Sequence, residues 1–334
     1  MNLEKCLIIA EAGVNHNGRL DLALELCEAA KRAGADVVKF QTWKTENLLT
    51  RNVEQAEYQA QNTGVQESQF DMLKKLELSY DDFRKIKQHC DEIGILFSST
   101  ADETESLDFL VELGIPFIKV GSGEIGNVSY LRYMGRKGLP VILSTGMSTL
   151  ADVDVSVNAL KEGGATDITV LHCTTNYPCP YEDVNLKAML TLRDAFHLPI
   201  GYSDHTIGRE VAVSAVALGA KIVEKHFTLD CKMDGPDHAA STEPHDFAEL
   251  VRAIRIVEAC LGTGIKEPTI REKKISKVVM KRIVAKRMIQ KGEKLSEENV
   301  CVKRNDVGIL ARYWNLVVGR NASKDYIEDE GIQF

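Results

Sequence analysis

The sequence lacks several features that would assign its 334 residues to a specialised class of protein. No apolar run approaches the roughly 18 residues that a membrane-spanning helix needs. The first residues show neither the charged segment nor the cleavage site of a signal peptide. The eight cysteines form no Cys-X-X-Cys pair, which argues against structural zinc and favours reduced thiols. We therefore expect a cytoplasmic protein.

An excess of positive charge is also absent. Lys and Arg number 41 against 49 Asp and Glu, which gives a formal net charge of −8. A mildly acidic chain is a poor match for nucleic acid or for an anionic membrane, so we expect neither as a partner. Hydrophobic residues make up 44% of the chain, enough to bury a substantial core in one large domain or two smaller ones.

The chain does contain a regular alternation of short apolar runs and amphipathic segments. Eight runs are rich in Ile, Val and Leu, as is typical of strands buried on both faces. They span residues 6–12, 37–42, 96–100, 117–122, 141–145, 168–173, 199–204 and 222–227. The segments between them begin at polar residues such as Asp21, Asp102 and Thr149 and several end at glycine, as helices do.

Eight units of a strand followed by a helix predict an α/β fold, a (β/α)8 TIM barrel, over residues 1–262. An open doubly wound sheet is the alternative, but the first strand is not followed by a GxGxxG motif. The polar insert at roughly 43–80 suggests a lid or a substrate loop. Residues 263–280 are interpreted as a linker, and residues 281–334 as a small second domain.

Polar side chains occur where the apolar runs end, which is the edge of a TIM barrel that carries catalysis. Lys39 and Lys119 are costly in buried strands unless an anion pairs with them. Together with neighbouring hydroxyl groups they would suit a phosphate and a carboxylate. Two alternatives remain, namely ion pairs of these lysines with Glu11 and Glu124, or a Schiff base on one lysine.

Two histidines, His205 and His226, end the adjacent seventh and eighth runs. Neighbouring strands lie about 4.8 Å apart, so two imidazoles there can share one ion. Two histidines without cysteine favour a divalent ion completed by water, Mn²⁺ before Zn²⁺. Asp204 and Glu224 could orient these histidines or hold water beside the ion. The alternative is a pair of histidines bonded to the backbone. His172 lies inside an apolar run and is expected to be a hydrogen-bonded core residue.

Eight sequence blocks, taken together, resemble those of a known family. In chain order they are AEAGVNHNG, GADVVKFQT, FIKVGSGE, VILSTGM, LHCTTNYPCPYEDVNL, GYSDHT, ALGAKIVEKHFTLD and GPDHAAS. They resemble the sialic acid synthase family, whose members condense phosphoenolpyruvate with an N-acylated hexose to give a nine-carbon 2-keto sugar acid and phosphate. The later segment IVAKRMIQKGEKLSEENVCVKR resembles the antifreeze-like (SAF) domain of these transferases.

This resemblance implies roles for the residues at the strand ends. Lys39, Lys119, Glu11 and Glu124 would be catalytic. The residues implied to bind phosphoenolpyruvate are Lys39, Thr100, Lys119, Ser122, Ser144, Asn176 and Ser203. Those implied to contact the sugar are Gln41, Tyr177, Asp237 and Arg304, the last from the other subunit. His205 and His226 would hold a divalent metal, with Mg²⁺ or Co²⁺ as alternatives to Mn²⁺.

The resemblance also implies a domain-swapped homodimer in which each SAF domain caps the active site of the other subunit. In that arrangement the eight Lys and Arg residues within 281–304 would face the active site of the other subunit. The alternative is that these residues form a solvated face. Two positions depart from the family pattern. Lys303 to Asp306 spell KRND where KRPG is usual, and Thr175 stands where some members have asparagine, so either Thr175 or Asn176 fills that position.

Within the family, KFQT and the insert EYQAQNTGVQESQFDMLKKLELS are most similar to bacterial legionaminate synthases. The expected acceptor is then 2,4-diacetamido-2,4,6-trideoxymannose. The first alternative is an N-acetylneuraminate synthase that acts on N-acetylmannosamine. Two further alternatives are a Schiff-base pyruvate lyase and a sugar- or ice-binding protein without catalytic activity.

Overall fold

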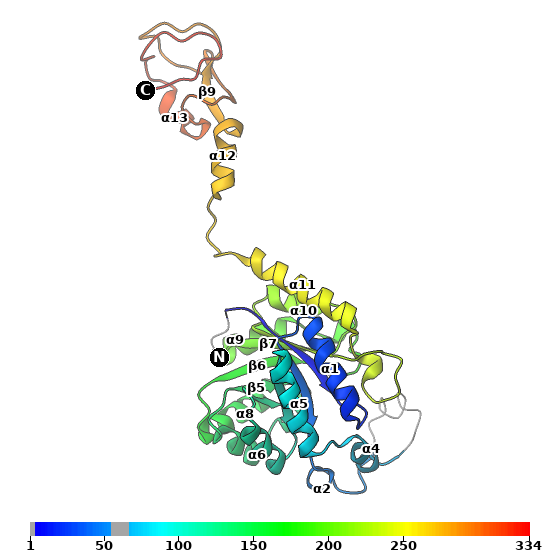
Figure 1. The fold of residues 1–334 in the computed structure, drawn as a ribbon. Coiled ribbons are helices and arrows are strands. Elements are labelled where there is room, and N and C mark those ends of the chain that lie inside the picture. The colour runs from blue at the N-terminus through cyan, green and yellow to red at the C-terminus, as the bar shows by residue number, and fades with distance from the viewer. Residues whose placement is uncertain (1–3, 55–66) are drawn as a thin grey trace. The chain divides into compact units, whose positions relative to one another are not determined.

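The computed structural model describes residues 4–54 and 67–334, and the chain divides into two compact units, Met1–Gly262 and Thr263–Phe334. Eight parallel strands form a closed barrel in the first unit, in which β1 pairs with both β2 and β8 (Figure 1). This confirms the predicted TIM barrel. The strands are β1 (Leu7–Gly13), β2 (Val37–Thr42), β3 (Leu96–Ala101), β4 (Ile118–Val120), β5 (Val141–Ser144), β6 (Ile168–Cys173), β7 (Ile200–Asp204) and β8 (Ile222–His226).

The interior of the barrel is layered because alternate residues of a strand share a face. One layer is apolar and forms a buried cluster of Ile9, Val37, Phe117, Ile142, Leu171 and Ile222. Two positions further along the same strands are polar or ionisable residues, namely Glu11, Lys39, Lys119, Ser144, Cys173 and Glu224. The apolar layer thus closes the barrel beneath a layer that carries charge.

Helices surround the strands, and their apolar faces form the larger core between sheet and helix (Figure 1). They are α1 (Leu20–Arg32), α5 (Tyr80–Ile93), α6 (Thr104–Leu113), α7 (Val128–Gly135), α8 (Leu150–Gly163), α9 (Lys187–Phe196), α10 (Glu210–Ala217) and α11 (Pro244–Leu261). Thr149 caps α8, with Asp152 completing a capping box, as its position before the helix predicted. None of the helices in the described ranges is long and apolar enough to cross a membrane.

Two of the predicted helix starts are wrong. Asp21 lies in the first turn of α1, after the N-cap residue Arg19. Glu103, not Asp102, caps α6, because its carboxylate accepts hydrogen bonds from the backbone N–H groups of Glu105 (2.7 Å) and Ser106 (2.9 Å). Asp102 therefore remains available for another role.

The insert after β2 contains two helices, α2 (Thr45–Leu48) and α4 (Gln69–Leu76). A small cluster of Val14, Trp43, Met72 and Leu76 packs this insert against the segment that follows β1. Residues 55–66, which belong to the predicted lid or substrate loop, lie outside the described residues.

The second unit has its own core. Its strands β9 (Lys281–Ala285) and β10 (Val300–Arg304) pair in antiparallel register, and Arg304 stands opposite Lys281. The buried residues are Ile283, Ala285, Ile289, Leu295, Val300, Val317, Ala322, Tyr326 and Ile332. This unit also contains α12 (Ile270–Val279), within the segment interpreted as a linker, and α13 (Trp314–Val317).

Candidate active site

One cavity of about 190 Å³ lies where the inward-facing polar side chains converge, at the carboxyl ends of the strands. Most of the residues singled out from the sequence line it. They are Glu11, Lys39, Gln41, Thr100, Lys119, Ser122, Ser144, Tyr177, Ser203, His205 and His226. Strand register explains the convergence, since Glu11 stands opposite both Lys39 and His226, and Thr100 stands opposite Lys119.

Lys39 lies at the centre of a buried polar network. Its Nζ is 2.6 Å from Glu11 Oε2 and donates a hydrogen bond to Thr100 Oγ1 at 3.0 Å. Gln41 donates to the other oxygen of Glu11 at 3.1 Å. Burial raises the pKa of Glu11 to about 7 despite the opposing charge of Lys39. Glu11 can therefore take up or release a proton near neutral pH.

Glu224, expected beside the two histidines, is the second buried carboxylate of the network and lies near both lysines. Its oxygens are 3.8 Å from Lys39 Nζ and 3.5 Å from Lys119 Nζ, and it accepts a hydrogen bond from Ser203 at 3.2 Å. Burial raises the pKa of Glu224, but the two lysines outweigh burial and hold that pKa below its ordinary value. The ion-pair alternative is thus correct for Lys39 and Glu11, whereas Lys119 faces Glu224 and not Glu124.

Lys119 and the nearby hydroxyls form the part of the cavity best suited to an anion. Its ammonium group donates to Ser144 Oγ at 2.8 Å and to the carbonyl of Val120 at 3.2 Å. Ser122 lies close by and accepts a hydrogen bond from the N–H of Gly146 at 2.9 Å. Burial lowers the pKa of Lys119 in spite of Glu224. A bound anion would restore the preference for the charged amine.

The two histidines lie side by side on β8 and just after β7, with ring centroids 5.4 Å apart. His205 Nδ1 is 2.7 Å from the carbonyl of Thr174. A proton on Nδ1 would be donated to that carbonyl, which leaves the lone pair of Nε2 free to bind a metal ion. Burial lowers the pKa of His226, which keeps its ring neutral as a metal ligand requires. Asp237 Oδ2 lies 3.9 Å from His226 Nδ1.

This donor set fits a divalent ion that keeps open coordination positions. In residues 4–54 and 67–334, no cluster of three or more His, Cys, Asp or Glu side chains is arranged to hold a metal. An ion bound by the two imidazoles would complete its coordination with oxygen atoms of water or substrate, which are ligands that Mn²⁺ and Mg²⁺ commonly take. His226 Nδ1 is buried and has no hydrogen-bond partner in that part of the chain.

Four residues singled out from the sequence do not line this cavity. Glu124 lines a neighbouring cavity and accepts a hydrogen bond from Asn127 at 2.7 Å. Asn176 is exposed, while Thr175 lines the central cavity. Asp237 is buried beside His226. Arg304 is exposed at the end of β10 in the second unit.

Three other side chains of the central cavity were missed, namely Asp102, Met147 and Cys173. The period of two along a strand would have found Asp102, which follows Ser98 and Thr100 on one face of β3. The same period turns Asp204 and Lys225 outward, where they form an ion pair of 2.7 Å, so Asp204 does not orient the histidines. His172 bonds to the carbonyl of Val184 at 2.7 Å, which confirms its predicted core role.

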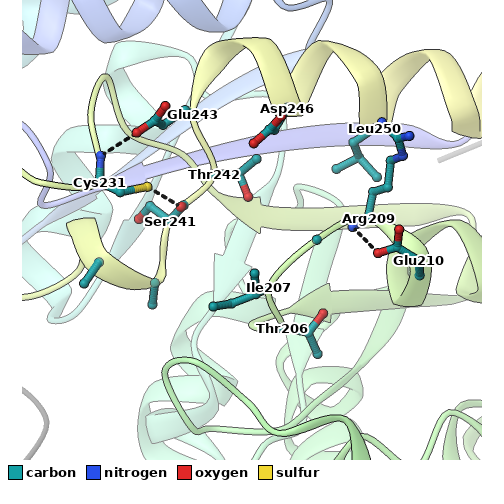
Figure 2. A pocket seen from close by; sticks show the side chains of 13 residues that line it. Thr206, Ile207, Arg209, Glu210, Cys231, Ser241, Thr242, Glu243, Asp246 and Leu250 are labelled. Carbon is teal, nitrogen blue, oxygen red and sulfur yellow. Dashed lines mark hydrogen bonds between the residues drawn. The ribbon is translucent and has the colours of Figure 1, made fainter.

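A larger cavity, of about 450 Å³, lies between the turn after β7 and the start of α11 (Figure 2). None of the residues singled out as site residues lines it. Its polar groups are engaged in local turns, since Cys231 donates its N–H to Glu243 and Arg209 donates its N–H to Glu210 (Figure 2). The central cavity therefore remains the better candidate for chemistry.

Comparison with known proteins identifies the family of this chain. The NeuB family model matches residues 26–266, and the SAF domain model matches residues 282–334. The N,N'-diacetyllegionaminic acid synthase of Campylobacter jejuni is 46% identical over 99% of this chain and 100% of its own length. That of Legionella pneumophila is 46% identical over 95% and 90%. The crystal structure of N-acetylneuraminic acid synthetase from Leptospira borgpetersenii aligns with a TM-score of 0.73 at 34% identity, covering 81% of this chain and 90% of that one. The chain belongs to the NeuB family and carries a SAF domain at its carboxyl end.

Proposed function

We propose that this protein is a transferase that condenses phosphoenolpyruvate with 2,4-diacetamido-2,4,6-trideoxymannose to give N,N'-diacetyllegionaminate and phosphate. The supporting observation is a single cavity that joins two buried lysines to a pair of histidines. The names and the 46% identity of the Campylobacter and Legionella synthases support the choice of acceptor.

Each part of the cavity suits one part of this reaction. Lys119, Ser144 and Ser122 would bind the phosphate, and Lys39 with Thr100 would bind the carboxylate, which directs carbon 3 of the donor towards the acceptor. His205 and His226 would hold the divalent metal, which when bound polarises the aldehyde of the open-chain sugar. Gln41, Tyr177 and Asp237 would contact the sugar.

The reaction needs a group that handles protons while water adds to carbon 2 of the donor. Glu11 suits this role because it lines the cavity and burial raises its pKa to about 7. Its carboxylate would accept one proton from the water. When the carbon–oxygen bond to phosphate breaks, the new hydroxyl on carbon 2 becomes the ketone and its proton leaves with the phosphate. The acceptor oxygen gains a proton as the new carbon–carbon bond forms, which balances the step.

An acceptor panel tests the proposed function. Phosphate release from phosphoenolpyruvate would be measured with Mn²⁺ and either the 2,4-diacetamido sugar, its gluco-configured relative or N-acetylmannosamine. We expect kcat/KM for the 2,4-diacetamido sugar to exceed that for N-acetylmannosamine by about tenfold or more, because the two sugars differ at carbons 4 and 6 and even one changed substituent in a shaped pocket has effects of that size. Equal use of N-acetylmannosamine would favour the N-acetylneuraminate synthase alternative.

The lowered pKa of Lys119 favours one second candidate, a lyase that forms a Schiff base with pyruvate. Borohydride treatment in the presence of pyruvate would then attach a three-carbon adduct to the protein, detectable by mass spectrometry. The proposed synthase gives no adduct and requires the metal, so an adduct together with full activity in EDTA would contradict it.

We further propose a cytoplasmic, domain-swapped homodimer in which Arg304 of one subunit contacts the acceptor bound by the other. The exposed guanidinium at the end of β10 and the basic segment 281–304 support this arrangement. Arg304→Ala should raise KM for the acceptor about tenfold, the usual cost of losing a hydrogen bond from a charged group. Arg312→Ala, an exposed position of the same unit, is the control.

Subunit mixing distinguishes a swapped dimer from an unswapped one. If the SAF domain acts on the other subunit, a Lys119→Met chain mixed with an Arg304→Ala chain contains some intact sites and regains activity. In an unswapped protein every site keeps one of the two defects, and the mixture stays as weak as its components.

A further inference from the structure

We propose that Asp102 contacts the acceptor sugar, with its carboxylate accepting hydrogen bonds from hydroxyl or amide N–H groups of that substrate. The inference rests on the proposed function and adds a residue that determines how the acceptor binds. It starts from the position of Asp102, which follows β3 and lines both the central cavity and a second cavity of about 820 Å³ beside it.

The backbone directs this side chain to the substrate. Thr100 faces the central cavity and bonds to Lys39, and Asp102 lies two residues further along the same face. The N–H of Asp102 bonds to the carbonyl of Thr42, which continues the ladder between β2 and β3 past the end of β3. Because Glu103 caps α6, Asp102 has no role at the helix start.

The carboxylate of Asp102 is not engaged by the residues that the structure describes. Among the residues that the structure describes, no hydrogen bond or ion pair reaches it, although the side chain is partly buried. The surrounding charges explain why. The ammonium group of Lys39 is already engaged by Glu11 at 2.6 Å and lies 3.8 Å from Glu224, while Glu124 and Glu103 repel the Asp102 carboxylate. A bound ligand with O–H or N–H groups would give this partly buried carboxylate the hydrogen bonds that the described residues do not supply.

The charge balance indicates which substrate this ligand is. Glu124, Glu11 and Glu103 surround Asp102 with negative charge, which would repel the phosphate of phosphoenolpyruvate. The donor instead matches the side formed by Lys119, Ser122 and Ser144. A neutral sugar with several O–H and N–H donors matches an acceptor-rich surface. Asp102 and Gln41, which both line the central cavity, bring carboxylate and amide oxygens to such a surface.

The volumes of the two cavities also support a contact between Asp102 and the acceptor sugar. The central cavity, about 190 Å³, is smaller than the roughly 300–1,000 Å³ typical of ligand pockets, so two substrates need additional space. Asp102 is the residue shared with the 820 Å³ cavity, whose lining includes the hydrogen-bonding side chains of Asn47, Glu124, Asn127 and Ser129. A six-carbon sugar with N-acyl groups can extend past Asp102 into that cavity.

The test is the kinetics of Asp102→Asn, which keeps the shape of the side chain but removes its charge. With the 2,4-diacetamido sugar and Mn²⁺, we expect KM for the acceptor to rise about 10- to 100-fold while KM for phosphoenolpyruvate stays within about twofold, because only a hydrogen bond to a charged group is lost. Asp154→Asn, an exposed position on α8, should leave both values unchanged.

A stability measurement shows that the variant is folded. Burial, Glu124 and Glu11 raise the pKa of Asp102 to about 7 against the pull of Lys39, so its ionised form is disfavoured in the folded protein. This penalty is greatest above pH 7 and shrinks towards acid pH. Asp102→Asn should therefore raise Tm more at pH 8 than at pH 5, while acceptor binding weakens.

The outcomes separate this inference from the function on which it rests. Wild-type protein that releases no phosphate with any acceptor of the panel would overturn the proposed function itself. Active wild-type protein with an unchanged acceptor KM in Asp102→Asn would overturn only the role of Asp102. A change confined to the phosphoenolpyruvate KM would likewise overturn it, because the carboxylate would then act on the donor side.

Discussion

Lys119→Met is expected to lower kcat/KM for phosphoenolpyruvate by about 10³-fold, the upper range for removing one preorganised donor from an active site. The ammonium group lies between Ser144 Oγ at 2.8 Å and Glu224 Oε1 at 3.5 Å, in the part of the cavity that suits an anion. The stability loss should be much smaller than the kinetic loss, because Glu224 keeps Lys39 and Ser203 as partners. Steady-state kinetics and thermal melting measure the two effects.

Lys225→Met is the matched control, because this lysine is equally buried but faces away from the cavity. Its Nζ lies 2.7 Å from Asp204 and also donates to the carbonyl of Thr206 at 2.7 Å. Breaking a buried pair in this way costs about 3–5 kcal/mol of unfolding free energy. The folded fraction should keep a normal KM for phosphoenolpyruvate. If Lys119→Met and Lys225→Met gave the same pattern, the assignment of Lys119 to the donor site would be wrong.

The second large effect is expected for His226→Ala. Loss of one of two imidazole ligands should lower kcat more than about 100-fold, equivalent to roughly 3 kcal/mol of transition-state stabilisation. It should also reduce the Mn²⁺ that the purified protein retains, measured by elemental analysis after dialysis. The fold should tolerate the change, because His226 Nδ1 has no hydrogen-bond partner among the described residues.

His245→Ala serves as the control, since the side chain of His245 is 89% exposed at the start of α11. It should alter neither the metal content nor turnover. Near-normal turnover of His226→Ala after the metal is stripped and restored would contradict the metal assignment. Restoration of wild-type activity by Mn²⁺ after EDTA treatment would support it.

Much of the fold and part of the site could be predicted because both follow from the strands. Lys39, Lys119, His205 and His226 each end or follow an apolar run, and parallel strands bring such ends to one edge. The sequence alone does not show which residues face each other across the closed barrel. That information decides the partner of Lys119, because Glu224 reaches it from β8 whereas Glu124 is only near in sequence.

The other wrong predictions chose between two adjacent residues, only one of which takes the predicted position. Asp102 and Glu103 are both acceptable helix caps by composition, and only the backbone path selects Glu103. Similarly, Thr175 lines the cavity while the adjacent Asn176 is exposed. A turn after a strand sets such orientations, and residue type alone does not determine them.

The layered interior has a consequence for how such enzymes diverge. The charged layer is carried by the strands themselves, two positions above the apolar layer that closes the barrel. Gln41 and Asp102 lie at the end of a strand or just beyond it, where the chain leaves the barrel. Selection for a new sugar can therefore rebuild the strand-end turns and leave the phosphoenolpyruvate machinery, and the folding of the barrel, unchanged.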